Sequence, residues 1–569
     1  MSELLTKYGG LMVLAAMLSA GCTASQYAKR ADRSAYGALA MGQAVALGQS
    51  EPFDVEYRPF CADQVDSDCV IRIGKKLVRT GDVEPVALTL DECLEVALRN
   101  SRSFQNEKEV LYSEALALAN ARRSWDVPLL QGELDGDIEH TSINKVSETK
   151  AASASVGPSI QQRFVHGGVL TLAATLEWAT DFISGSSDEN VVGSLLEANI
   201  TQPLLRGAWR GLAYEDQYRL ERDFLFAVFD YHRFRQTFIA NIFTRYYSVL
   251  QQRDQLENDR ISIGQQKRTF ELTKVQVEGG QVSRVEQDRA EQAMLQAQVR
   301  FERRQQNYQD GLDSFKLLLG LPIEASIELD YPDALRSLSD VGPKDVGFGE
   351  IEAIDMAFAA RPDVLVERAK LRDSERDVEI AADDFLPQLD LEMGISAAGR
   401  EPRGFWDPKF NRNERFVKMT FNYNLDQTDN RDNYRLAMID YEKAGRDLAE
   451  FLDDVRLEVR SAYRELVQSK RSFELQDKNV RIANRRYRLA SLRQKEGQLS
   501  ATDVLDAEQD LRLAKNDLTS ALVSYTTTRL EFLTTLGMID VDEKGKLHER
   551  TEPFKFGRIS RRYEYVDTR

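Results

Sequence analysis

Hydrophobic and polar positions follow two different periods in this chain, and the two periods alternate along it. Between Leu90 and Ser124 apolar residues recur every three to four positions, which indicates an amphipathic helix that Pro128 ends. In "LQGELDGDIEH" (130–140) and "LTLAATLEW" (170–178) they recur every second position, which indicates strands with one apolar face. The sequence therefore predicts helices and half-apolar strands in turn.

The same order of elements recurs in the second half of the chain. The first half continues with a strand-like run at 196–205 and two proline-free helical segments, 211–279 and 281–319, separated by glycines. The second half is predicted to be helical to Phe385 and stopped by Pro387, and then to contain strands (388–396, 417–425), a long helix (431–496) and a return helix (498–536). At 1.5 Å per residue, each long helix would span roughly 100 Å.

A repeated stretch marks the turn between each long helix and its return helix. "GGQVSRVEQDRAEQ" (279–292) and "EGQLSATDVLDAEQ" (496–509) align with a constant offset of 217 residues. The same offset places Leu319-Gly320 over Leu536-Gly537. A period this long indicates two copies of one large unit rather than a solenoid of short repeats.

The strands need a different environment from that of a soluble sheet. The helices lack an apolar stripe wide enough to cover the apolar faces of the strands. Lipid on one side of the strands and a water-filled lumen on the other explain their alternation better. Open sheet edges cannot lie in lipid, so the strands must close into a barrel, and closure requires several chains in a symmetric ring. The last helix carries a coiled-coil seam with spacings of three and four: Val504, Ala507, Leu511, Ala514, Leu518, Ala521, Tyr525, Thr528 and Phe532. The first copy keeps this register with Ala290, Met294, Ala297, Phe301, Tyr308 and Phe315.

Charge and the N-terminus narrow the class further. Acidic residues outnumber basic ones by 92 to 75, for a net charge of −17, which argues against a nucleic-acid-binding surface. The apolar stretch Gly10–Cys22 follows Lys7 and is typical of a secretory signal. Its end, "LSAGC", resembles a bacterial lipobox. That resemblance implies cleavage before Cys22, lipid on this cysteine and, with Thr23 next, sorting to the outer membrane; an ordinary signal with an incidental cysteine is the alternative.

Three cysteines remain after the signal. Cys61 and Cys69 enclose a short loop whose spacing, in an exported protein, is compatible with a disulfide. Cys93 falls on an apolar helical face and is predicted to be a buried thiol. Residues 23–86 look irregular and have little periodicity.

The whole plan resembles the TolC-like outer membrane efflux proteins over about residues 88–537. The resemblance rests on the duplicated halves, on Pro128 and Pro387 before strands, on "TQPLLRG" (201–207), and on the glycine turn followed by "DVLDAEQ" (503–509). It implies a mainly α fold in which a homotrimer builds a long helical barrel. That barrel would be continuous with a twelve-stranded outer-membrane β-barrel, to which each chain gives four strands. The segment 145–181 is longer than a two-strand crossing needs, so it adds either a hairpin or a long extracellular loop.

The resemblance also implies a division of the chain and a function. The expected parts are a lipoprotein signal (1–21), an equatorial or periplasmic extension (22–87), the first repeat (88–320), an equatorial linker (321–350), the second repeat (351–537) and a tail (538–569). The expected function is a passive exit duct for efflux or type I secretion. Its partners would be a periplasmic adaptor, an inner-membrane transporter and outer-membrane lipid.

The resemblance places two kinds of functional residue at the helix turns. The tips that would dock the adaptor are Gly280, Gln281, Val282 and Ser283 in the first copy and Gly497, Gln498, Leu499 and Ser500 in the second. Acidic residues that would ring the periplasmic aperture are Asp503, Asp506 and, in the first copy, Glu286. Asp503 and Asp506 are three apart and so share a helix face, but negative charge at a helix start also suits the helix dipole.

The sequence offers little support for catalysis. None of His140, His166, His232 and His548 lies three or four residues from another, so no helical histidine pair is available for a metal. No phosphate-binding GxxxxGK[ST] loop is present, and we expect neither a cofactor nor an enzyme activity. The competing hypotheses are a periplasmic coiled-coil scaffold without a pore and a secreted hydrolase.

Overall fold

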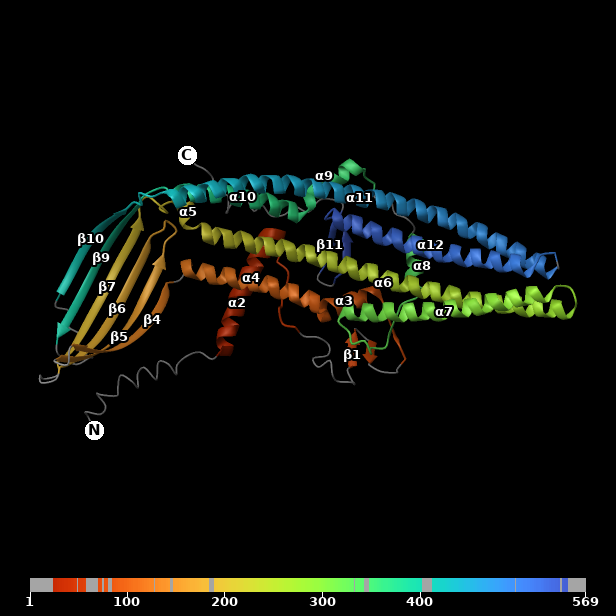
Figure 1. The fold of residues 1–569 in the computed structure, drawn as a ribbon, viewed down its shortest axis with the longest axis horizontal. Coiled ribbons are helices and arrows are strands. Elements are labelled where there is room, and N and C mark those ends of the chain that lie inside the picture. The colour runs from red at the N-terminus through yellow and green to blue at the C-terminus, as the bar shows by residue number, and fades with distance from the viewer. Residues whose placement is uncertain are drawn as a thin grey trace, which may run out of the picture.

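The protein is an elongated molecule with a β-sheet at one end and two helix turns at the other (Figure 1). The computed structural model describes residues 24–48, 50–57, 70–73, 76–79, 84–126, 128–143, 147–183, 189–331, 333–341, 347–401, 412–496, 498–542 and 545–550. Within these ranges, no helix combines the length and the apolar character that crossing a bilayer requires. The large sheet lies at one end of the long axis, and the long helices run from it to the other end.

Six antiparallel strands form the sheet in the described part of the chain, in the order β10-β9-β7-β6-β5-β4. They are β4 (Leu129–Ile143), β5 (Ser147–Arg163), β6 (Val169–Ile183), β7 (Glu189–Pro203), β9 (Gln388–Glu401) and β10 (Arg412–Asn422). The prediction of four strands per chain is wrong, because the long segment 145–181 folds largely as paired strands. Of the two alternatives for this segment, the added hairpin is the correct one.

The helices that lead into the sheet are each broken once. The predicted helix 90–124 consists of α3 (Leu90–Asn100) and α4 (Arg102–Asp126), and its counterpart consists of α9 (Glu350–Ala360) and α10 (Pro362–Asp383). Ser101 and Arg361 have extended backbone angles at the two breaks. Each break turns a backbone carbonyl toward the glycine that ends a return helix. A Cβ on Gly320 would lie 2.2 Å from the Asn100 oxygen, and one on Gly537 would lie 2.9 Å from the Ala360 oxygen.

Two long helices and two return helices form the body of the molecule. They are α6 (Glu215–Glu278), α7 (Arg284–Leu319), α11 (Thr428–Lys495) and α12 (Ala501–Thr535), and the four helical predictions for these segments are confirmed within a few residues. α6 has 64 residues and α11 has 68, which corresponds to about 100 Å each. A short helix, α5 (Arg210–Ala213), precedes α6, and Tyr214 between them contacts the ring of Trp125 at the end of α4.

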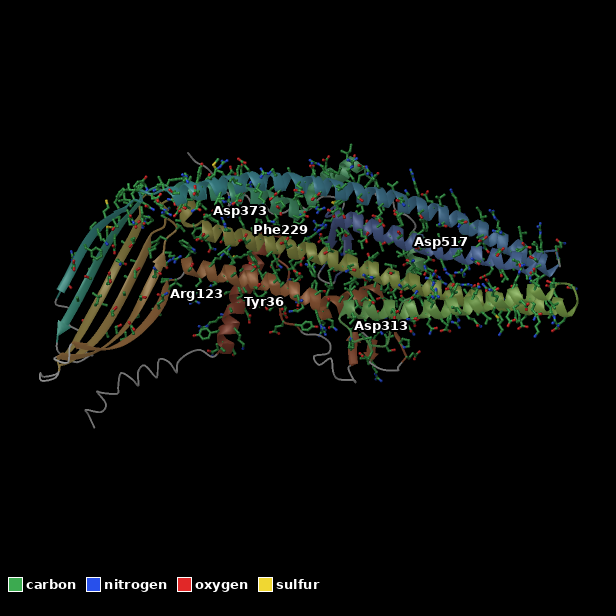
Figure 2. The ribbon with its side chains drawn as sticks, in the orientation of Figure 1. Tyr36, Arg123, Phe229, Asp313, Asp373 and Asp517 are labelled. Carbon is green, nitrogen blue, oxygen red and sulfur yellow. The ribbon has the colours of Figure 1, made fainter. Side chains whose placement is uncertain are left out.

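The N-terminal region is more ordered than its sequence suggested. α2 (Ala24–Leu47) buries Ala35, Leu39 and Gly42 against α4 and α6, so the expectation of irregular structure is wrong for these residues. Small residues let α2 approach closely, and a Cβ on Gly42 would lie 2.2 Å from the ring of Phe224. Figure 2 shows Tyr36 on α2, which extends from the side of the bundle, and Phe229 on α6.

Short strands and one short helix complete the middle of the molecule. β1 (Val70–Ile73) pairs with β2 (Lys76–Arg79), β3 (Val86–Leu88) pairs in parallel with β8 (Ile327–Leu329), and β11 (Ile539–Val541) pairs with β12 (Leu547–Glu549). α8 (Asp333–Val341) lies in the segment that connects the two halves. The largest apolar cluster joins these elements to α3, α6, α9 and α12, so the core lies at mid-height rather than at the turns.

The cysteine predictions have different outcomes. Cys93 is a free, fully buried thiol on α3, as predicted, and burial raises its pKa well above the ordinary value. Cys22, Cys61 and Cys69 lie outside the described residues. The lipid attachment and the disulfide therefore stay predictions.

Candidate functional site

Backbone hydrogen bonds close the first helix turn, and Ser283 makes no side-chain cap there. Gly280 has φ 68°, a left-handed conformation that favours glycine, and a Cβ there would meet no atom within 4 Å. The backbone N–H of Gln281 donates to the Gln276 oxygen at 2.8 Å and so closes the end of α6. Val282 is half-buried, whereas Gln281 and Ser283 are exposed. The turn therefore presents backbone and small side chains at the end of the molecule.

The second turn repeats the closure of the first and adds a side-chain cap. The N–H of Gln498 donates to the Arg493 oxygen at 2.9 Å, five residues back, as in the first turn. Ser500 and Asp503 form a reciprocal capping box at the start of α12. Leu499 packs against a small cluster of Ala490, Val504 and Ala507 that fastens the turn to both helices. Gly497 lies outside the described residues.

The three predicted aperture carboxylates have different roles in the chain. The Asp503 carboxylate accepts hydrogen bonds from the backbone N–H and hydroxyl of Ser500, at 3.2 and 2.7 Å. Glu286 accepts from the Thr502 hydroxyl at 3.1 Å and so connects the start of α7 to the start of α12. The Asp506 side chain is exposed beside the capped turn. The structure therefore places Glu286 beside the second turn. Asp503 caps the start of α12.

A buried polar layer between α6 and α12 was missed by the sequence analysis. Asp259 is 2% exposed and pairs with Arg512 at 3.2 Å, and the Gln266 amide donates to Glu508 at 2.9 Å. Arg512 lies four residues from Glu508, so their side chains line the helix face beside the coiled-coil seam. This spacing of four residues was the signal in the sequence that Glu508 and Arg512 lie on one helix face. The partners on α6 could not be assigned from it, because they lie more than 240 residues away.

The predicted coiled-coil seam of α12 is buried, with only Leu518 intermediate among its nine positions. In the first copy Ala290, Ala297, Tyr308 and Phe315 are buried, and Met294 and Phe301 are intermediate. α12 packs against α11, and α7 packs against α6. The seam therefore holds each return helix on its long helix within one chain.

The strand register gathers apolar positions on one face of the sheet. One row of directly opposite residues consists of Leu130, Ile160, Leu172, Ala198 and Ile395, and it ends with Arg415 on β10. Opposite residues of antiparallel strands share a face, and Leu130 and Ile395 are 73% and 56% exposed. The adjacent row, on the other face, consists of Gln131, Ser159, Ala173, Glu197, Ser396 and Glu414. An exposed apolar face backed by a polar one is the pattern of a membrane β-barrel wall.

Comparisons with known proteins agree with this architecture. A family described as outer membrane efflux protein matches residues 353–538. The chain is 22% identical over 467 residues to the toxin and drug export protein A of Aggregatibacter actinomycetemcomitans, covering 78% of this chain and 97% of that protein. It is 23% identical over 450 residues to the pyoverdine export outer membrane protein OpmQ of Pseudomonas putida, covering 75% and 89%.

Solved structures share the fold at low sequence identity. The open state of the Neisseria gonorrhoeae MtrE outer membrane channel matches with a TM-score of 0.59 and 16% identity, covering 87% of this chain and 98% of that one. The outer-membrane channel OprN matches with a TM-score of 0.58 and 15% identity, covering 79% and 89%.

Proposed function

The chain belongs to the TolC-like outer membrane efflux proteins, and from this premise we propose that it is the outer-membrane exit duct of a tripartite efflux or type I secretion system. The observation that carries the proposal is the sheet with an exposed apolar face, joined directly to helices about 100 Å long. Such a molecule can anchor in the outer membrane and reach far into the periplasm. It is a passive pore, and an inner-membrane transporter supplies the energy through a periplasmic adaptor.

A homotrimer would complete the pore. β4 and β10 are the two edge strands of the sheet, and a sheet edge in lipid must be paired. Helix α11 also keeps an uncovered apolar side: Leu475, Ile482 and Leu489 recur every seven residues and are 65, 56 and 57% exposed. Symmetric copies would cover this side and pair the edge strands. The two halves, divided as 88–320 and 351–537, would stem from an internal duplication, since their turns and glycine contacts correspond.

Lipidation of Cys22 would add an anchor at the membrane. α2 begins two residues later, at Ala24, and packs on α4 and α6, so an attached lipid would be linked to the body by an ordered helix. Mass spectrometry of the N-terminal peptide should show diacylglycerol on Cys22. An unmodified peptide spanning 20–25 would show instead that the signal is of the ordinary kind.

The two tips would dock the adaptor. At the first tip the open surroundings of Gly280 let another chain approach the backbone. The double variant Gly280→Trp/Gly497→Trp should keep its trimers and lose transport. Gly264→Trp, within the α6 helix that leads to the first tip, is the control away from the tips, because a Cβ at that position also meets nothing within 4 Å. Wild-type transport in the double variant would exclude docking at these turns.

The exit-duct function is tested by conductance. The purified protein should need detergent for extraction and should give single-channel currents in a planar bilayer. A coiled-coil scaffold or a hydrolase would give no current, and that outcome would overturn the proposed function. The relatives' names mention toxin, drug and pyoverdine export, so efflux assays with these three cargo types are the first to perform.

A further inference from the structure

The sheet contains one hairpin that continues no helix. β4 follows α4, β7 leads to α5 and α6, β9 follows α10, and β10 leads to α11. β5 and β6 are joined only to other strands, and the turn between them spans 164–168. The sheet therefore has two more strands than there are helices that lead into it.

The helices stand in the same order as the strands that they continue. α4 packs on α6, α6 on α10 and α10 on α11, and the corresponding strands follow one another as β4, β7, β9 and β10. The β5–β6 hairpin is inserted between β4 and β7 (Figure 1). The hairpin widens the sheet and adds no helix to the layer formed by α4, α6, α10 and α11.

The turn of this hairpin is built into the junction between sheet and helices. Gly167 has φ 79°, and a Cβ there would lie 2.8 Å from the Gly207 oxygen. The Gln202 amide donates to the His166 oxygen at 2.8 Å. On the other side, the Gln162 amide donates to the Trp125 oxygen at the end of α4, at 2.6 Å. These contacts hold the turn at the same level as the starts and ends of the helices.

The two faces of the sheet continue through the hairpin without interruption. Ile160 and Leu172 lie in the apolar row between Leu130 and Ala198. Ser159 and Ala173 lie in the adjacent row on the opposite face, beside Glu197. β5 and β6 thus have the alternation of a barrel wall and not that of an extracellular loop.

Simple geometry explains why two extra strands fit. Strands about 4.8 Å apart and tilted by about 40° each take up about 6 Å of a barrel's circumference. Six strands then cover about 38 Å, whereas four would cover about 25 Å. Four helices side by side, at about 9–10 Å each, also cover about 38 Å. The hairpin brings the width of the sheet up to the width of the helical layer.

We propose that three copies of the six-stranded sheet close an eighteen-stranded barrel whose mouth admits large, hydrated cargo. Because barrel diameter grows roughly linearly with strand number, its lumen would be about one and a half times as wide as that of a twelve-stranded barrel. The inner wall would carry the polar rows with Glu197, Glu392 and Glu414, which suit solvated, polar solutes. This proposal rests on the trimeric exit duct proposed above.

Polymer exclusion in planar bilayers tests the width of the barrel. Poly(ethylene glycol) of graded size is added on the extracellular side of the full-length channel and of a variant lacking residues 147–183, in which β4 joins β7. The full chain should admit polymers with a radius about one and a half times the cut-off of the deletion variant. A conducting full-length channel with the same cut-off as the variant would overturn the wide barrel and leave the exit duct intact. Absence of current in the full chain would overturn both.

Cysteine labelling decides the matter if the deletion variant does not assemble. A membrane-impermeant maleimide should react with Ser159→Cys and Ala173→Cys on the polar face, and should leave Ile160→Cys and Leu172→Cys unlabelled in lipid. Glu197→Cys and Ala198→Cys on β7 are matched controls for the two faces. Labelling of the unsubstituted chain gives the background. If all four hairpin positions react alike while the β7 pair alternates, the hairpin lies outside the wall and the eighteen-stranded barrel is wrong.

Discussion

The two halves of the chain share an order of elements but use their apolar side chains differently. α6 of the first half buries Phe224, Phe229 and Tyr246 within the chain. α11 of the second half leaves Leu457, Leu475 and Ile482 67, 65 and 56% exposed. The first half therefore supplies more of the core of the single chain. The second half presents an exposed apolar side, which further copies of the chain would cover.

The halves also differ at the two ends of their helices. The first half gives four strands to the sheet and the second gives two. At mid-height, Gly320 approaches the backbone of a broken helix more closely than Gly537 does. At the turns, the second copy has a capping box and the first has no side-chain cap. Each difference leads to an experiment that contrasts the halves.

The largest effect is expected from charge on the exposed side of α11. Leu475→Asp/Ile482→Asp should abolish the trimer, because each buried, unpaired carboxylate would cost several kcal/mol at an interface between copies. Native electrophoresis and light scattering measure the oligomer. Arg481→Ala is the control, since it removes only an exposed ion pair with Asp477 and should leave the trimer intact. A stable trimer in the double variant would mean that this side of α11 faces solvent.

A smaller effect is expected at the two mid-height glycines. Gly320→Ala should lower the free energy of unfolding by about 3 kcal/mol, since it combines positive φ with a severe backbone clash. Gly537→Ala should cost about 1–2 kcal/mol, because its neighbour is farther away. Thermal unfolding of the purified protein measures both, and Gly264→Ala, in a helix with open surroundings, should be neutral or stabilising. Equal losses at both glycines would contradict the difference between the halves.

His232 should give the first half an acid-sensitive group that the second half lacks. Burial, reinforced by nearby Arg235, lowers its pKa to about 4, whereas the corresponding position in the second half is Ala449. The unfolded chain binds this proton near pH 6.5 and the folded chain does not, so stability falls as pH drops from about 6.5 to 4, by roughly 2–3 kcal/mol. His232→Gln should reduce this loss in melting experiments at pH 7 and pH 4.5. An unchanged loss would show that carboxylates alone set the acid sensitivity.

The smallest effects are expected at the second turn. Asp503→Ala should remove half of the capping box and cost about 1 kcal/mol at the start of α12. Asp506→Ala should leave stability unchanged and, if six carboxylates ring the aperture of a trimer, should weaken the preference for cations. Reversal potentials and divalent block in bilayers separate the two roles. Unchanged selectivity in the double variant would place the constriction elsewhere and leave Asp503 as a cap alone.

The local pattern of the sequence was sufficient to predict the four helices that form the body of the molecule. Periodicity near 3.6 predicts α6, α7, α11 and α12 because these helices are long enough for the signal to accumulate. The glycines at 279–280 and 497, together with the repeated stretch at a constant offset, located the two turns, since turn chemistry depends on a few neighbouring residues. The burial of Cys93 followed from its place on one helix face. Alternation also showed which strand face is apolar.

Other features were decided only by contacts between distant segments. The breaks at Ser101 and Arg361 depend on glycines more than 170 residues away, and the pairing of Asp259 with Arg512 joins two separate helices. The number of strands in the sheet depended on whether residues 145–181 paired with β4 and β7, because a strand is stable only where neighbours accept its hydrogen bonds. Sequence by itself thus determined the long helices, their return helices, the turns between them and the apolar face of the strands. The tertiary structure alone decided how many strands make the sheet, because that number is set by the pairing of strands with their neighbours.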